Sequence, residues 1–296
     1  MIAALHNKDG FFKYYTADSA KLTLRATTRK WSTPFEFNDP FDNQFDLFFE
    51  EPSDELAARE VNRLHEILTS PVPPKPGQFG SLAPQIEIIR QALLAHPDFK
   101  FTEDELADLR EGAVEGMRGT INNLPQANAE IRALLADTSI FCVSETHDNL
   151  LMWSHYAQNH TGAVIKFLSL AKVDSPLILA QPVRYSARLP RIEFSTLWDL
   201  DAAKKAVYET ITLSKSDVWS YEREWRIVTG LRDKTKPFEI LPFAPQEIGA
   251  VYLGCKMTDR DRQEIIGISR QKYPTAKIFQ AVKHESEYAL NFTEIA

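Results

Sequence analysis

The chain is poor in cysteine, in long apolar runs and in targeting signals. Its 2 cysteines among 296 residues, Cys142 and Cys255, lie far apart and outside any paired-cysteine motif. We therefore expect neither a disulfide framework nor a zinc finger. No apolar run approaches the ~20 residues that cross a bilayer. The first ten residues contain His6, Lys8 and Asp9, which a signal peptide would not have. These absences predict a cytoplasmic protein.

The chain also lacks an excess of positive charge, since 34 Lys and Arg residues stand against 41 Asp and Glu residues and the formal net charge is −7. This excludes nucleic-acid binding through the overall field of the protein, although it leaves room for a local basic groove. There is no glycine-rich phosphate loop and no helical His-Glu-x-x-His pattern. Gly254-Cys255 lacks the further glycines of a Rossmann-type dinucleotide fold. The 44% hydrophobic and 25% charged residues are ordinary for a globular protein.

The middle of the chain differs in composition from its two flanks. Residues 51–136 are rich in Ala, Leu, Glu and Arg with helical periodicity, and we interpret them as a helical insertion. Ser53 or Asp54 caps the first helix, and Thr102 with Glu105 forms a capping-box pattern for the third. The expected helices run to about Leu68, over Ala83–Ala95, to about Ile121 and over Pro125–Ala136.

The flanks, residues 1–50 and 137–296, predict a mixed core made of strands and a few helices. The expected strands are Phe11–Thr16, Ile140–Ser144, Ala163–Phe167, Pro182–Tyr185, Glu224–Val228, Ile248–Leu253 and Lys277–Val282. The expected helices are Leu150–Asn159, Leu200–Ser214 and one from Thr258 to about Gln271. In addition, Leu22–Ala26 alternates apolar and polar residues, and Trp31–Phe37 is extended around Pro34. The fold class is therefore α+β, with a mixed sheet and an inserted helical lobe.

An acid-rich stretch, Tyr221-Glu222-Arg223-Glu224-Trp225-Arg226, is the strongest chemical feature. Side chains alternate between the faces of a strand, so Glu222, Glu224 and Arg226 would share one face. Two carboxylates about 7 Å apart beside a guanidinium suit general acid–base chemistry or ligand recognition. They equally suit a structural ladder of ion pairs.

Three further clusters contain candidate site residues. Lys13 and Tyr14 lie on the first strand, where they contact a ligand or pack. Asn38, Asp39 and Asp42 crowd between aromatic residues, either as the polar wall of a pocket or as a turn that bonds its own backbone.

The third cluster lies at residues 152–162. His155 and His160 are five residues apart, which is a poor spacing for a metal on one helix. Ser154 and His155 are adjacent and do not form a nucleophile–base pair.

The order of these motifs resembles the bacterial domain-of-unknown-function family 2971. The resemblance rests on the aromatic Lys-Tyr strand, on Phe-Asn-Asp-Pro-Phe-Asp at 37–42 and on Phe-Cys-Val-Ser at 141–144. It continues through Met-Trp-Ser-His-Tyr-Ala at 152–157, the trailing His160-x-Gly162, and residues 221–226. It covers most of the chain outside the helical insertion, and the family label itself implies no activity.

The layout is also similar to that of ADP-ribosyltransferase-like proteins. These carry a His or Arg on a first strand, an aromatic or hydroxyl residue on a second and a catalytic glutamate on a later one. The first strand here has Lys13 or Tyr14 instead, with His6 and Arg25 as substitutes further away. This resemblance implies cleavage of NAD, in which a carboxylate stabilises positive charge on the ribose. It implies a toxin-like or phage-defence effector that modifies nucleic acid or protein.

Resemblance and clusters together give the candidate site. The expected catalytic residues are Glu222, Glu224 and His155. The expected NAD-binding residues are Lys13, Tyr14, Trp31, Ser32, Asn38, Asp39, Trp153, Tyr156 and Arg226.

Two alternatives stay open. In a metal-dependent nuclease or phosphodiesterase, a divalent ion would gather carboxylates and histidines from separate segments. These would be Asp39, Asp42, His155, His160, Glu222 and Glu224. In a non-enzymatic module, the aromatic and polar motifs would build a core, and the helical insertion would bind a partner.

Overall fold

The computed structural model describes residues 5–295, with the side chains of residues 200–202 left aside. The chain forms two compact units. The first, here called the sheet unit, consists of Met1–Asn43, Leu134–Ala187 and Leu213–Ala296. The second, the helical unit, consists of Gln44–Ala133 and Arg188–Thr212. The helical unit thus includes residues 188–212, which the sequence analysis had grouped with the core. No helix in the described part of the chain is long and apolar enough to cross a membrane.

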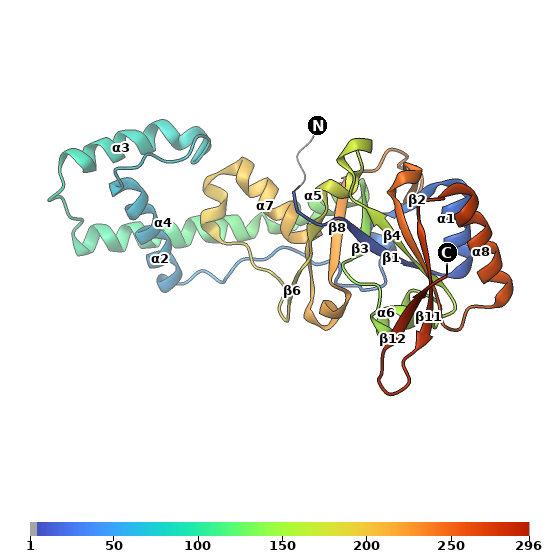
Figure 1. The fold of residues 1–296 in the computed structure, drawn as a ribbon. Coiled ribbons are helices and arrows are strands. Elements are labelled where there is room, and N and C mark those ends of the chain that lie inside the picture. The colour runs from blue at the N-terminus through green and yellow to red at the C-terminus, as the bar shows by residue number, and fades with distance from the viewer. Residues whose placement is uncertain (1–4, 296) are drawn as a thin grey trace. The chain divides into compact units, whose positions relative to one another are not determined.

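The sheet unit is built on one mixed sheet, which confirms the α+β prediction (Figure 1). Its strands are β1 (Gly10–Tyr15), β2 (Thr28–Ser32), β3 (Thr138–Ser144), β4 (Ala163–Leu168), β5 (Gln181–Pro182), β8 (Glu224–Gly230), β9 (Phe238–Pro242), β10 (Ile248–Leu253), β11 (Lys277–Lys283) and β12 (Leu290–Glu294). The order is β12-β11-β10-β4-β1-β3-β2-β9, and β8 pairs with both β3 and β5. β10 and β11 are parallel, whereas β3 and β8 are antiparallel. A separate parallel pair joins β6 (Arg184–Ser186) to β7 (Ser214–Ser216).

One face of the sheet packs against α1 (Ala17–Ala26) and α8 (Asp259–Lys272), which lie side by side in Figure 1. Phe11 on β1 and Phe141 on β3 point into this core. The alternation noted over Leu22–Ala26 belongs to helix α1 and not to a strand. Thr16 caps this helix, and Ala20 and Leu24 are four residues apart, so both face the core.

The other face of the sheet carries the short helix α6 (Leu150–His155). Met152 and Trp153 of this helix pack in a second buried cluster with residues of β1, β4 and β10. The helix is shorter than the predicted Leu150–Asn159. It ends early because three successive residues from Gln158 to His160 have positive φ, which an α-helix does not allow. Gly162 follows this turn, and a Cβ there would collide with the carbonyl oxygen of Tyr15.

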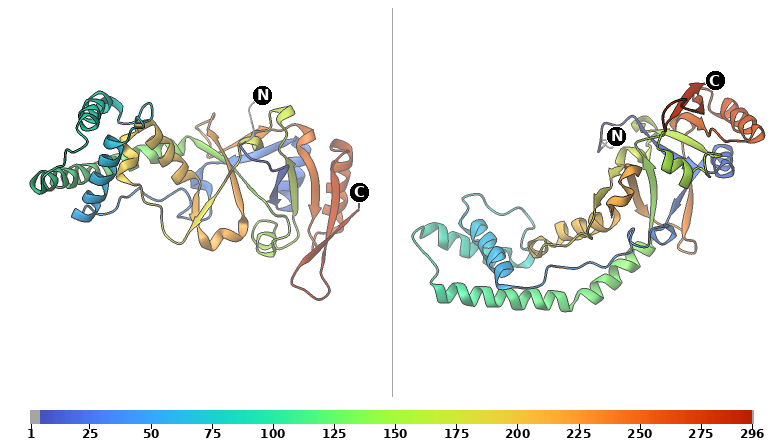
Figure 2. Two further views of the ribbon diagram at one scale, coloured as in Figure 1. Left: turned by 60° about the vertical axis from the view of Figure 1, so that its left-hand side comes forward. Right: turned by 90° about the horizontal axis from the view of Figure 1, so that it is seen from below.

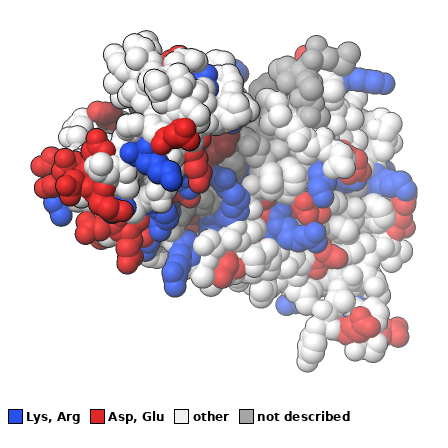
Figure 3. Space-filling model, turned by 90° about the vertical axis from the view of Figure 1, so that its left-hand side faces the viewer, with Lys and Arg blue, Asp and Glu red and all other residues white. Residues whose placement is uncertain are grey.

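The helical unit contains α2 (Asp54–Thr69), α3 (Ala83–Ala95), α4 (Glu103–Asn122), most of α5 (Leu124–Ala136) and α7 (Leu200–Thr212). Helix α2 packs against both α3 and α4 (Figure 2). The predicted caps are confirmed, because the Ser53 hydroxyl accepts from the amide of Leu56 and Thr102 forms a capping box with Glu105. Acidic side chains gather on part of the face seen in Figure 3. Lys and Arg side chains lie beside them on the same face (Figure 3).

Candidate functional site

The sheet opens between β1, β2 and β3. β1 pairs with β3 at Phe12 opposite Ser144, and β2 pairs with β3 at Ser32 opposite Ile140. Between these two points, the carbonyl oxygen of Cys142 accepts a hydrogen bond from the Lys13 ammonium at 2.6 Å. A lysine side chain thus takes the place of a neighbouring strand. A pocket of about 470 Å³ lies at this opening, lined by residues of the sheet unit.

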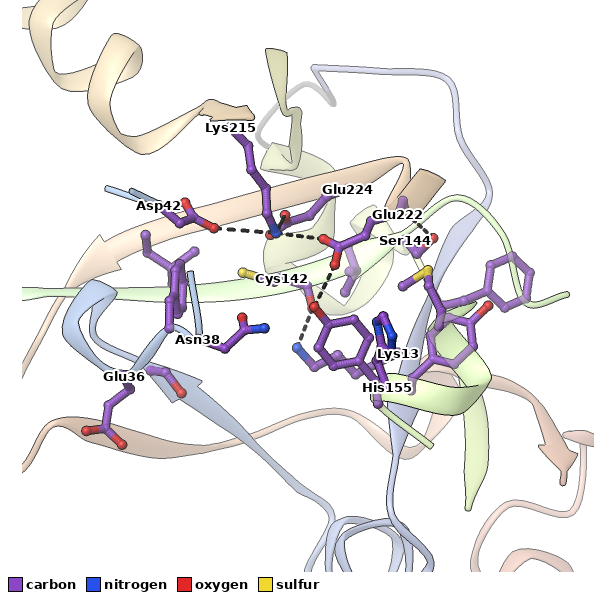
Figure 4. A pocket seen from close by; sticks show the side chains of 18 of the residues that line it. Lys13, Glu36, Asn38, Asp42, Cys142, Ser144, His155, Lys215, Glu222 and Glu224 are labelled. Atoms are coloured by element: carbon purple, nitrogen blue, oxygen red, sulfur yellow. Dashed lines mark hydrogen bonds and ion pairs between the residues drawn. The ribbon is translucent and has the colours of Figure 1, made fainter. Parts of the chain in front are cut away.

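The pocket has an aromatic wall and a charged wall. Phe12, Tyr14, Phe37 and Tyr156 supply rings, and Met152 adds an apolar side chain. The charged wall contains Asp42, Lys215, Glu222 and Glu224, whose side chains point toward one another in Figure 4. Lys13 and Lys30 also line the pocket. This combination suits a ligand with flat rings and ionised groups.

The charged wall is a buried network of three carboxylates and two cations. The Lys215 ammonium lies 2.6 Å from Glu222, 2.9 Å from Glu224 and 3.4 Å from Asp42. The Arg226 guanidinium donates to both oxygens of Glu224, at 2.8 and 3.1 Å, and to Asp42 at 2.7 Å. With all five groups ionised, the network keeps one negative charge beside the pocket.

The prediction that Glu222 and Glu224 share one strand was wrong. Glu222 ends a 3₁₀ helix, η6 (Asp217–Glu222), and β8 begins only at Glu224. Arg223 between them has a left-handed backbone, with φ of 45°, and its exposed side chain pairs with Glu145. The two glutamates nevertheless come together, because both bind Lys215.

The two glutamates have different environments. Burial raises the pKa of Glu222 above its ordinary value, although the ammonium of Lys215 acts against this shift. Burial would also raise the pKa of Glu224, but Arg226 and Lys215 outweigh it and hold that pKa well below the usual range. Glu224 is therefore fixed as a carboxylate, and Glu222 is the one that can change its protonation.

The partners of Glu222 are also perturbed. Burial raises the pKa of Tyr156, and the nearby Glu222 carboxylate raises it further, so this phenol stays protonated and donates to Glu222 at 2.6 Å. Burial alone would lower the pKa of Lys215, but its three carboxylates raise it well above the ordinary value. Lys215 therefore remains a cation throughout the physiological pH range.

Most of the predicted site residues meet in this pocket. Those that line it are Lys13, Tyr14, Ser32, Asn38, His155, Tyr156, Glu222 and Glu224. His155 is exposed, and its Nδ1 lies 3.3 Å from the Tyr221 hydroxyl.

Four predicted cofactor-binding residues lie elsewhere. Trp31 packs in the core on the opposite face of the sheet, and Trp153, on α6, is fully buried between this helix and the sheet. The Asp39 side chain accepts from the amide of Phe41, as in the turn considered from the sequence. Arg226 lies behind the pocket wall and holds Glu224.

The sequence also suggested His6 and Arg25 in place of a His or Arg on the first strand, and His160 as a candidate metal ligand. These three residues lie outside the pocket lining. His6 contacts the carbonyl oxygen of Leu177, and Arg25 pairs with Glu264. Nε2 of His160 lies 3.2 Å from the Ser154 hydroxyl, outside the pocket lining. Within residues 5–295, no group of three or more His, Cys, Asp or Glu is placed to hold a metal ion.

Sequence reasoning missed Lys215, the residue that joins the carboxylates. It lies on β7, and its side chain is buried. No motif contains it, and its position depends on a parallel pairing with β6, where Tyr185 is opposite Lys215. Lys30 and Cys142 were also missed. Lys30 lies two residues before Ser32 on β2, and Cys142 lies two residues before Ser144 on β3. Residues two apart on a strand share a face, so this spacing was the available signal.

Comparisons with known proteins give one match. Residues 152–227 match the family described as "Protein of unknown function (DUF2971)". No curated protein and no solved structure matches significantly. The matched segment contains six pocket residues, among them His155, Lys215 and Glu222. The part of the chain that matches the DUF2971 family model is thus residues 152–227, which include Lys215, Glu222 and Glu224 of the charged wall.

Proposed function

We propose that this protein is an ADP-ribosyltransferase-like enzyme that uses NAD and breaks the bond between nicotinamide and ribose in this pocket. The observation that supports the proposal best is Glu222, a carboxylate that lines an aromatic-walled pocket and is fixed from two sides. Lys215 holds one of its oxygens and Tyr156 the other, both at 2.6 Å. A carboxylate held in this way is suited to face a developing positive charge.

The residues of the pocket fit the parts of NAD. The volume of about 470 Å³ lies within the range of small-molecule pockets, about 300–1,000 Å³. Phe12, Phe37 and Tyr156 offer rings against which nicotinamide or adenine can stack. Lys13 donates to a neutral carbonyl, and Lys30 lies over the Phe238 ring; no ion pair with a carboxylate is found for either among the described residues. Their ammonium groups therefore suit the phosphates of a dinucleotide.

The proposed chemistry needs one carboxylate and one acceptor. NAD supplies a glycosidic bond whose cleavage leaves positive charge on the ribose carbon, while the electron pair departs with nicotinamide. Glu222 stabilises that charge, and Lys215 and Tyr156 keep the carboxylate in place. The acceptor, a protein or nucleic-acid group or water, bonds to the carbon and loses a proton. His155, exposed at the pocket, is the residue we assign to receive it.

The metal-dependent alternative has less support. A cation site needs carboxylates with free lone pairs, whereas Asp42, Glu222 and Glu224 are already paired with Lys215 and Arg226. Of the residues considered for that site, Asp39 and His160 do not line the pocket.

The test is release of nicotinamide from NAD by the purified protein, with Glu222→Gln beside the wild type. We expect the variant to lose about 100- to 1,000-fold in rate, as for removal of one preorganised charge-stabilising group. Glu285→Gln, at an exposed position of the sheet unit, is the matched control and should keep full activity.

The same assay with labelled NAD shows where the ribosyl group goes. Incubation with protein or with nucleic acid distinguishes the two acceptor classes from hydrolysis by water. If the wild type neither binds NAD at millimolar concentration nor releases nicotinamide, the proposal is wrong, and the non-enzymatic module becomes the better hypothesis.

A further inference from the structure

Lys215 joins the carboxylates of the site and belongs to none of the motifs that suggest its function. Its ammonium has three donors, and it has three carboxylates within 3.4 Å: Glu222, Glu224 and Asp42. We propose that Lys215 is a positioning residue that keeps the Glu222 carboxylate ionised and directed into the pocket, while Glu224 anchors Lys215 and does not act on the substrate. The catalytic part of this inference rests on the proposed function.

The contacts of the two glutamates separate their roles. Both oxygens of Glu224 accept from the buried guanidinium of Arg226, and one also accepts from Lys215. If Glu224 turned toward a ligand, the buried guanidinium of Arg226 would lose two hydrogen bonds and keep only Asp42 as a carboxylate partner, which is costly. Glu222 has Lys215 on one oxygen and only the neutral hydroxyl of Tyr156 on the other. It can therefore engage a ligand at the expense of one ordinary hydrogen bond.

The backbone fixes Lys215 before any ligand arrives. It lies on β7, opposite Tyr185 of β6, and the Tyr185 hydroxyl accepts from the amide of Glu224 at 2.8 Å. The ammonium lies 5.3 Å from the centre of the Trp219 ring, a cation–π distance. The strand register, the Trp219 ring and the three carboxylates all hold the ammonium of Lys215 in one position. The positive charge beside Glu222 is therefore preorganised.

The charge state of Glu222 depends on the groups that face it from five parts of the chain. These groups are Lys215 on β7, Glu224 on β8, Tyr156 after α6, Tyr185 on β6 and Tyr221 on η6. Of these, only Lys215 is a cation. Without it, burial and the negative charge of Glu224 both favour the protonated acid. A neutral carboxyl group cannot stabilise a positive charge, so removal of Lys215 would disable Glu222 without touching it.

The direct test is a titration of the ligand-free protein, with the carboxyl carbons of glutamate labelled for NMR. The signal of Glu222 is identified by its absence in Glu222→Gln. Lys215→Met should raise its midpoint by about one to three pH units, the usual effect of one close opposite charge. Lys215→Arg, which keeps the charge, should bring the midpoint back toward the wild-type value. The matched control is Lys277→Met, since this exposed lysine of the sheet unit pairs with Glu294 at 3.0 Å.

A second variant covers the case in which Lys215→Met does not fold. Glu224→Gln keeps Lys215 and removes the competing negative charge, so the midpoint of Glu222 should fall. A purely structural role for Lys215 predicts no shift in Lys215→Met, and the fall in Glu224→Gln tests whether the charge state of Glu222 follows its charged neighbours. An unchanged midpoint in the folded variants would overturn the inference.

Nicotinamide release then connects the titration to catalysis. The pH at which the rate falls on the acid side should follow the Glu222 midpoint from variant to variant. Midpoints that shift in a protein without NAD turnover would refute the proposed function and still support the control of Glu222 by Lys215. If nicotinamide is released but the pH at which the rate falls does not follow the Glu222 midpoint, the role of Lys215 in catalysis is refuted.

Discussion

Arg226 is the most deeply buried charge of the site. Its removal should lower the free energy of unfolding more than the removal of an exposed charge would. Its side chain has 0% exposure, and it holds Glu224 at 2.8 Å and Asp42 at 2.7 Å. In Arg226→Met, an apolar side chain replaces the guanidinium, and Lys215 is left to compensate three buried carboxylates. Loss of one partner from a buried ion pair costs about 3–5 kcal/mol. We expect a decrease of that size in the free energy of unfolding.

Urea denaturation followed by tryptophan fluorescence measures this change. Arg223→Met is the matched control, because Arg223 lies three residues away and its side chain is 62% exposed, although it pairs with Glu145 at 3.0 Å. An exposed pair contributes about 0–1 kcal/mol. Adding Glu224→Gln to Arg226→Met should recover part of the lost stability, because it removes an unpaired charge. Equal losses for Arg226→Met and Arg223→Met would refute the interpretation of this wall as a tightly coupled ion network.

Two further predictions concern stability. Gly254→Ala should destabilise the sheet unit by several kcal/mol, because its Cβ would collide with the carbonyl oxygen of His160. In the control Gly267→Ala, within α8, the new Cβ meets nothing within 4 Å, and the variant should be more stable by about 0.5–1 kcal/mol. Thermal denaturation compares the two variants, and equal effects would contradict the backbone contact at Gly254. Arg226 helps to hold the pKa of Glu224 below its unfolded value of about 4.3, so the stability that Glu224 contributes is present above that pH and is lost as the pH falls further. Glu224→Gln should therefore flatten the acid side of a stability–pH curve, and an unchanged slope below pH 5 would contradict it.

Local signals made much of the fold predictable. A side-chain cap fixes where a helix begins, and the caps at Ser53, Thr102 and Thr258 are all found. Strands such as Ile248–Leu253 were predicted with the observed bounds, because their burial makes them almost entirely apolar. β12 was missed because it carries polar residues on exposed positions, and β9 because its buried position holds Glu239 while Ile240 is exposed. Both lie at the ends of the strand order. Their pairing partners, far away in sequence, decide that they are strands.

The strand period explains which site predictions succeeded. Trp31 and Ser32 were assigned to one site as neighbours, but adjacent residues on a strand face opposite sides. Ser32 lines the pocket, and Trp31 packs in the core 5.4 Å from the Phe141 ring. Lys215 was beyond reach for a different reason. Only the tertiary pairing of β7 with β6 brings this lysine to the glutamates, and no local pattern encodes such a pairing.

The break at Arg223 gives the glutamates their different roles. On a continuous strand, Glu222 and Glu224 would be equivalent members of one ladder, and each would have the same kind of neighbour two residues away. Because the strand begins only at Glu224, this residue alone shares a strand face with Arg226, which binds both of its oxygens. Glu222 stays on the preceding turn, where it meets Tyr156 and the pocket. Two carboxylates whose environments push their pKa values in opposite directions can take separate roles in one reaction. The left-handed residue between them, and not the strand period, thus makes Glu222 the carboxylate that is less tightly paired at the pocket.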